Sequence, residues 1–166
     1  IQPHPTSIGY MPDLTHLPES LTALQLTRHA LRIKGGSAHL AETTLDEIGL
    51  KSTAWNNRIS SYSKGMRQRT ALAFALAGAP SWLLLDEPMS GLDAVGRKQL
   101  LKLLKQRHQQ GAGIFVCSHI VPDLVRLCDH ILILSNGKLR SDLAIQEHSM
   151  DEISFVEDQL EQLSHL

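Results

Sequence analysis

Hydrophobic residues follow two different patterns along the chain. In the first part they recur at the spacing of amphipathic helices, which predicts helices over about 22–34, 38–48 and 64–77. Thr22 and Gln25 fit a capping box at the start of the first of these helices. Short continuous apolar runs predict strands, and further helices are expected between and after them. The expected strands are 8–11, 82–85, 114–117 and 131–134, and the further helices are about 94–110, a short one after Pro122 and one from about 151.

The order of these elements predicts the fold class. Three consecutive helices precede a block in which strands and helices alternate. Such alternation is typical of an α/β fold built on a parallel sheet. We therefore expect an α-helical subdomain inserted before the second half of a parallel α/β core. The later half of the 64–77 helix is apolar on all sides, which predicts deep burial. Asn136–Gly137 predicts a hairpin turn after the last strand.

The most informative stretch runs from Ser81 to Asp93 and reads SWLLLDEPMSGLD. Its apolar run suits a strand that is buried on both faces of a parallel sheet. Asp86 and Glu87 then stand at the carboxyl end of the strand, where open α/β sheets bind their ligands. Hydrolysis of a magnesium–nucleotide complex needs one carboxylate for the metal and one for the attacking water. The alternative is a strand that simply leads into an acidic helix cap.

Composition excludes several classes of protein. The chain has 166 residues, of which 42% are hydrophobic and 20% charged, as in ordinary globular proteins. Its formal net charge of −1 provides no basic field for nucleic acid or anionic lipid. The sequence has no apolar run of the length that spans a membrane. Its two cysteines make no disulfide framework, which favours a reducing cytosol. The chain starts with Ile1 rather than Met, so we expect part of a longer polypeptide.

A second motif precedes the apolar half of the 64–77 helix. It reads SYSKGMRQR from Ser61 to Arg69. Ser63 and Gly65 at a helix N-terminus offer a hydroxyl and free backbone N–H groups, and the helix dipole favours an anion there. The alternative is a plain serine cap without a ligand.

These motifs together resemble a known family. YSKGMRQR, LLLDEP, SGLD and CSH occur in this order and resemble the nucleotide-binding domain of ABC ATPases, a P-loop NTPase fold. The resemblance covers about 8–140, most of the chain. The wording of YSKGMRQR is similar to a bacterial branch with exporters and proteins of copper-enzyme maturation. The resemblance implies ATP and Mg²⁺ as cofactors.

The resemblance also implies roles for individual residues. Ser63 and Gly65 match the signature motif, which in the family reaches across a dimer to the γ-phosphate of ATP held by the other subunit. Asp86 matches the carboxylate that holds Mg²⁺ through water, and Glu87 matches the base that polarises the attacking water. Asp93 matches the D-loop aspartate at the dimer interface. His119 matches the switch histidine, which touches the γ-phosphate.

Two departures from the family pattern concern the phosphates. Asp13 stands where the family carries the Q-loop glutamine, and its carboxylate could meet Mg²⁺ or water. The added negative charge predicts weaker binding of the magnesium–nucleotide complex or altered coupling. The 166 residues contain no G-x-x-x-x-G-K-[ST], the phosphate-cradling Walker A loop. We therefore expect the C-terminal two-thirds of an ATPase, inactive on its own.

The resemblance implies a domain organisation. Residues 1–12 would end the N-terminal part of the ATPase core, and 13–79 would form the helical subdomain with the signature motif. Residues 80–144 would form the α/β core with Walker B, the D-loop and the switch histidine, and 145–166 a helical tail.

The function implied is that of an ATP-hydrolysing subunit of a bacterial ABC transporter. It would lie on the cytoplasmic face of the cell membrane, as a homo- or heterodimer with a second ABC ATPase subunit. An integral membrane permease would dock near 13–21, and no nucleic acid is expected. One alternative is a catalytically incomplete partner that lends its signature motif to a complete subunit. Another is a soluble ABC protein of DNA repair or translation.

Overall fold

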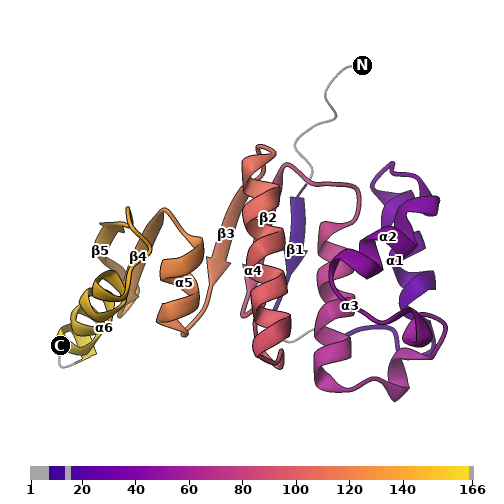
Figure 1. The fold of residues 1–166 in the computed structure, drawn as a ribbon, viewed down its shortest axis with the longest axis horizontal. Helices are drawn as coiled ribbons and strands as arrows, with labels where there is room; N and C mark the ends of the chain where they lie inside the picture. Colours follow the sequence, from indigo (N-terminus) through magenta and orange to yellow (C-terminus); the bar gives the residue numbers. More distant parts are fainter. Residues whose placement is uncertain (1–7, 14–15, 165–166) are drawn as a thin grey trace. The chain divides into compact units, whose positions relative to one another are not determined.

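The computed structural model describes residues 8–13 and 16–164 (Figure 1). The chain forms two compact units, Ile1–Cys117 and Ser118–Leu166. Part of the segment 13–21, where a permease is expected to dock, lies outside the described residues, as do 1–7 of the expected N-terminal part and the last two residues of the tail. Each unit is described by itself.

A parallel sheet of three strands organises the first unit. The strands are β1 (Ile8–Met11), β2 (Trp82–Asp86) and β3 (Gly113–Cys117), in the order β1-β2-β3. Met11 is aligned with Leu85, and Asp86 with Cys117. The carboxyl ends of all three strands therefore meet at one edge. The predicted strands and the parallel α/β class are confirmed.

Helices of the first unit begin and end close to where the sequence predicts. The longer ones are α1 (Ala23–Ile33), α2 (Ala41–Glu47), α3 (Lys64–Leu76) and α4 (Ala94–Gln109). Short 3₁₀ turns are η1 (Ala38–Leu40), η2 (Ser52–Ala54) and η3 (Ile59–Ser61). Thr22 and Gln25 form the expected capping box, with N···O distances of 3.0 and 3.1 Å. α3 packs against β1, α1 and α2, and α4 contacts β3.

The prediction that β2 is buried on both faces is wrong. Leu83 and Leu85 are buried, but Trp82 is 50% and Leu84 37% exposed. The pleat of a strand sends alternate side chains to opposite faces. A Cβ on Gly9, the neighbour of Leu83 in the sheet, would lie 2.3 Å from the Ala75 carbonyl oxygen. The buried set therefore faces α3, and the exposed set lies on the other face.

Burial of α3 is also less complete than its composition predicts. Ala73, Ala75 and Leu76 are buried as expected, whereas Phe74 is 36% exposed. The ammonium of Lys34 lies 5.6 Å from the centre of the Phe74 ring and donates a hydrogen bond of 3.0 Å to the Phe74 carbonyl. A long cationic side chain therefore partly covers this ring, instead of a second hydrophobic layer.

The second unit is a hairpin packed with two helices. Its elements are α5 (Val121–Leu127), β4 (His130–Ser135), β5 (Lys138–Ala144) and α6 (Met150–Ser164). The core consists of buried aliphatic residues: Val121, Val125, Ile131, Ile133, Ile145, Ile153 and Val156. Asn136 and Gly137 both have positive φ, 53° and 70°, as the two central residues of a type I′ turn require.

The last predicted strand, 131–134, belongs to this hairpin. In the described part of the chain, β4 pairs with β5 in a two-stranded antiparallel sheet. The two-residue turn explains why these two strands are antiparallel, since parallel neighbours need a crossover connection of a dozen or more residues.

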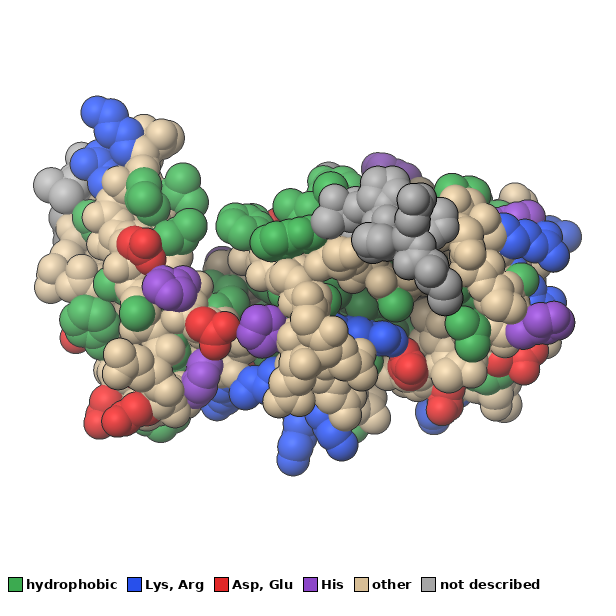
Figure 2. All heavy atoms as spheres, turned by 90° about the horizontal axis from the view of Figure 1, so that it is seen from above, with side chains coloured by type: hydrophobic (Ala, Val, Ile, Leu, Met, Phe, Trp, Pro, Cys, Tyr) green, Lys and Arg blue, Asp and Glu red, His purple; other side chains and the backbone are tan. Residues whose placement is uncertain are grey.

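Charged side chains are mixed on the surface. Figure 2 shows one face of the molecule, on which acidic, basic and hydrophobic groups are interspersed. Every helix in the described part of the chain is too short or too polar to cross a membrane.

Candidate functional site

The two adjacent carboxylates lie at the carboxyl edge of the parallel sheet. Asp86 is the last residue of β2, and its register partner is Cys117 at the end of β3. The backbone N–H of Glu87 donates to the Cys117 carbonyl at 2.9 Å, which anchors the residue just after the strand. Both carboxylate residues are partly buried. The buried apolar residues of β2 fix the strand in the sheet. The two acids therefore lie at its carboxyl end, where parallel sheets bind ligands.

The backbone of Glu87 adopts a conformation that residues with a side chain rarely adopt. Its φ is +46°, in the left-handed region. Pro88 follows it, and the side-chain amide of Gln68 donates to the carbonyls of Glu87 and Pro88, at 3.0 and 3.2 Å. Strained backbone of this kind persists where the surrounding structure holds it and clusters at functional sites.

Ser63 is the N-cap of α3. Its hydroxyl accepts a hydrogen bond from the backbone N–H of Met66 at 3.3 Å, and the residue is exposed. Ser63 therefore does cap the helix, as the alternative interpretation predicts. Its exposed hydroxyl and the N–H groups of the first helical turn also form a surface suited to an anion. Gly65 lies against the turn after β2, where an added Cβ would stand 2.9 Å from the Gly91 carbonyl oxygen. Only glycine fits that approach without a shift of the backbone.

Asp93 is the N-cap of α4. Its carboxylate accepts from the Gly96 N–H at 2.8 Å, and the Arg69 guanidinium lies 3.8 Å away. The acidic-cap alternative thus applies to Asp93, whose side chain is nevertheless largely exposed. A cap contact uses one acceptor site of a carboxylate and leaves others available.

The remaining predicted site residues follow the ends of strands. Asp13 is exposed and lies two residues beyond the end of β1. His119 is exposed and belongs to the second unit, two residues beyond the end of β3 and just before α5. The structure thus brings Asp86 and Glu87 to one edge, and Gly65 to the turn that follows them.

The carboxylates affect the neighbouring thiol. Partial burial, together with the negative charges of Asp86 and Glu87, raises the pKa of Cys117 above its ordinary value. The thiol therefore favours its protonated form more than an ordinary cysteine does. Over the described residues, groups of three or more histidine, cysteine or acidic side chains that could hold a metal ion are absent. A metal ion held by protein alone needs more ligands than one carboxylate. A single carboxylate at a ligand-binding edge instead suits Mg²⁺ that is bound to phosphates and keeps several waters.

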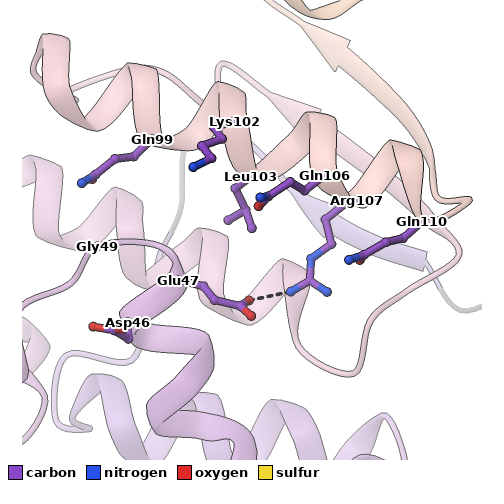
Figure 3. Close-up of a pocket in the computed structure, with 9 residues that line it drawn as sticks. All are labelled: Asp46, Glu47, Gly49, Gln99, Lys102, Leu103, Gln106, Arg107 and Gln110. Carbon is purple, nitrogen blue, oxygen red and sulfur yellow. Dashed lines mark hydrogen bonds and ion pairs between the residues drawn. The ribbon is translucent and has the colours of Figure 1, made fainter.

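A cavity of about 280 Å³ lies elsewhere, between α2 and α4 (Figure 3). Glu47 and Arg107 form an ion pair of 2.5 Å beside it. Its lining also includes Gly49 and Gln99, which contact Arg69. Neither Asp86 nor Glu87 lines the cavity, which is therefore separate from these two acids.

Comparison with known proteins decides the family. The family model described as ABC transporter matches residues 1–90, more than half of the chain. The chain belongs to the ABC transporter family. The matched range contains the signature residues and both carboxylates, whereas Asp93 and His119 lie beyond it.

Relatives bear names of the same kind. The uncharacterized ABC transporter ATP-binding protein sll0415 of Synechocystis is 36% identical over 137 residues, which cover 80% of this chain and 39% of the relative. The uncharacterized ABC transporter ATP-binding protein YxlF of Bacillus subtilis is 34% identical over 144 residues, or 84% of this chain and 48% of the relative. This ABC chain spans less than half the length of the curated relatives it matches first.

A solved structure agrees in fold. The ATP-binding cassette MJ0796, in a dimeric post-hydrolysis state bound to ADP and Pi, superposes with a TM-score of 0.79 at 25% identity. The match covers 84% of this chain and 63% of that chain. The predicted ABC ATPase fold is thereby confirmed.

Sequence reasoning missed the residues that connect the two motifs. Gln68 and Arg69 lie within the quoted YSKGMRQR stretch, yet only their contacts in the structure distinguish them from ordinary helix residues. Their spacing of three and four from Gly65 was the available signal, since such residues share one face of a helix.

Proposed function

We propose that this chain carries the signature motif and the catalytic carboxylates of an ATP-hydrolysing subunit in a bacterial ABC transporter. The reaction is attack of water on the γ-phosphate of ATP. The observation that carries the proposal is the strained Glu87 at the sheet edge, beside Asp86 and hydrogen-bonded through its carbonyl to the helix that Ser63 begins.

Each acid has its own part in this proposal. Glu87 accepts a hydrogen bond from the attacking water and polarises it, which requires a carboxylate within hydrogen-bond reach. Asp86 would hold Mg²⁺ through water, and the ion supplies neutralisation of charge on the phosphates. Asp13 and His119 follow the ends of β1 and β3, so we assign them contacts to the nucleotide and its water. These assignments rest on the family motifs.

These 166 residues contain no G-x-x-x-x-G-K-[ST], so the proposal assigns the phosphate-binding loop to a segment outside them. The exposed Ser63 hydroxyl at the start of α3 also fits a second candidate function, that of a partner which lends Ser63, Gly65 and Asp93 to a complete subunit. Both candidates share a dimer in which signature residues act on the nucleotide of the other subunit. In both, the helical segment 13–79 meets a permease at the inner face of the membrane.

The experiment is a measurement of phosphate release from ATP by the full-length protein in its native assembly. Glu87→Gln should lower kcat by about 10²- to 10⁴-fold, the usual contribution of a positioned base, while nucleotide still binds. Glu157→Gln removes an exposed carboxylate of α6 and serves as the matched control. Unchanged turnover in Glu87→Gln, with a wild type that hydrolyses ATP, would support the partner role and refute the catalytic one.

A further inference from the structure

One face of α3 runs along the loop that joins the acids to α4. Gly65, Gln68 and Arg69 are spaced by three and four residues, so they lie on the same side of the helix. Gly65 approaches Gly91, Gln68 reaches the carbonyls of 87 and 88, and Arg69 lies near Asp93. We call these three residues the α3 strip. The strip contacts the loop at its beginning, middle and end.

Gln68 is the member of the strip that touches Glu87. The residue is 6% exposed, and its single amide nitrogen donates to two successive carbonyls, at 3.0 and 3.2 Å. These carbonyls follow the last residue of β2, beyond the sheet ladder, and the Glu87 carbonyl also accepts from the Ser90 N–H at 3.0 Å within the turn. The bond to the Pro88 carbonyl is buried, where an unpaired acceptor is costly, so the amide favours the loop conformation that offers both carbonyls to it. That conformation includes the left-handed backbone of Glu87.

Arg69 secures the far end of the same loop. Its guanidinium donates to the Ile48 carbonyl at 2.6 Å and lies 3.8 Å from the Asp93 carboxylate. Two glycines make room for it: an added Cβ on Gly49 or Gly96 would stand 2.5 or 2.4 Å from a guanidinium nitrogen. One helix therefore contacts the loop at both ends, through hydrogen bonds at its start and through a longer ion pair at its far end.

We propose that Gln68 is a positioning residue that sets the Glu87 carboxylate for hydrolysis and links it to the signature end of α3. Ser63, at the start of this helix, would contact the nucleotide of a second subunit, while Gln68, five residues on, holds the acid of the first. A change in the contact between Ser63 and one nucleotide is thus transmitted by helix α3 to Glu87, the acid at the other nucleotide. The inference rests on the proposed function.

The test uses the full-length protein in its native assembly and compares two substitutions of Gln68. Gln68→Met keeps the length of the side chain and removes the donor. Gln68→His keeps an N–H at a similar reach. We expect Gln68→Met to lower kcat by about 10- to 100-fold, as small misplacements of catalytic groups do, with KM for ATP unchanged. Gln68→His should recover much of kcat.

The matched control is Gln106→Met, the same change at an exposed position of α4. It should leave kcat and KM as in the wild type. A wild-type kcat in Gln68→Met, or equal losses in Gln68→Met and Gln68→His, would overturn the role of Gln68 alone. If Gln68→Met fails to fold, a Gln68→His protein with intact KM and kcat supports the donor role, and one with lost kcat refutes it. A wild type without ATP hydrolysis would instead overturn the proposed function.

Discussion

At the scale of single residues, Asp13 is the clearest departure from the family pattern. It is exposed just beyond the end of β1, at the same sheet edge as Asp86. A carboxylate there adds negative charge near the phosphates that the proposed site holds, and it lacks the amide donor of glutamine.

We therefore expect Asp13→Gln to strengthen binding of the magnesium–nucleotide complex, by about three- to tenfold in Kd, on the order of 1 kcal/mol. Titration with a fluorescent ATP analogue measures this. Asp46→Asn, which removes another exposed carboxylate, should leave Kd unchanged. Equal Kd and equal turnover in Asp13→Gln and wild type would show that the residue has no contact with the nucleotide.

The residues that carry chemistry could be named from the sequence, but the contacts that hold them in position could not. Asp86, Glu87 and Ser63 stand in motifs whose chemistry follows from side-chain type and strand or helix ends. The left-handed φ of Glu87 and the two hydrogen bonds of Gln68 depend on how α3 packs across the turn after β2. Contacts between segments distant in sequence leave no local pattern to read.

At the scale of elements, local signals predicted what local interactions determine. The capping box of Thr22 and Gln25 is present, and Gly35 and Gly49 end their helices with positive φ, as C-terminal glycines do. Burial of β2 on both faces was wrong, because burial depends on what packs against a strand rather than on its composition.

The start of α6 is another capping motif, and it responds to acid. Glu152 accepts from the backbone N–H groups of Gln146, Glu147 and Ser149, and its own N–H donates to the Ser149 hydroxyl. These backbone hydrogen bonds, that of Gln146 foremost, lower the pKa of the Glu152 carboxyl below its ordinary value. A lowered pKa in the folded state stabilises the motif above the ordinary carboxyl pKa, and this stabilisation is lost as pH falls through the lowered value.

We expect hydrogen-exchange protection of the Gln146 and Glu147 amides, corrected for intrinsic rates, to fall in this acid range. Glu152→Gln should already show the reduced protection at neutral pH and little further change on acidification. Glu157→Gln, an exposed position of the same helix, should behave as the wild type. Protection that is independent of pH in the wild type would contradict the role of the Glu152 carboxylate.

At the scale of the whole molecule, the account depends on a site shared between two chains. Ser63 stands exposed at the end of α3, and the same helix holds the backbone of Glu87 through Gln68. A related cassette, MJ0796, was solved as a dimer with ADP and Pi. The α3 strip would make the two nucleotides of such a dimer interdependent.

The most direct test is the mass in solution of the full-length Glu87→Gln protein with and without ATP, compared with the double variant that also carries Ser63→Asn. Asparagine caps helices as well as serine does. The change therefore keeps the helix cap and replaces the hydroxyl that would contact the nucleotide. The account predicts that ATP brings two ATPase subunits together in Glu87→Gln, and that Ser63→Asn abolishes this association at unchanged thermal stability. Association that survives Ser63→Asn would contradict a signature motif that acts across the dimer.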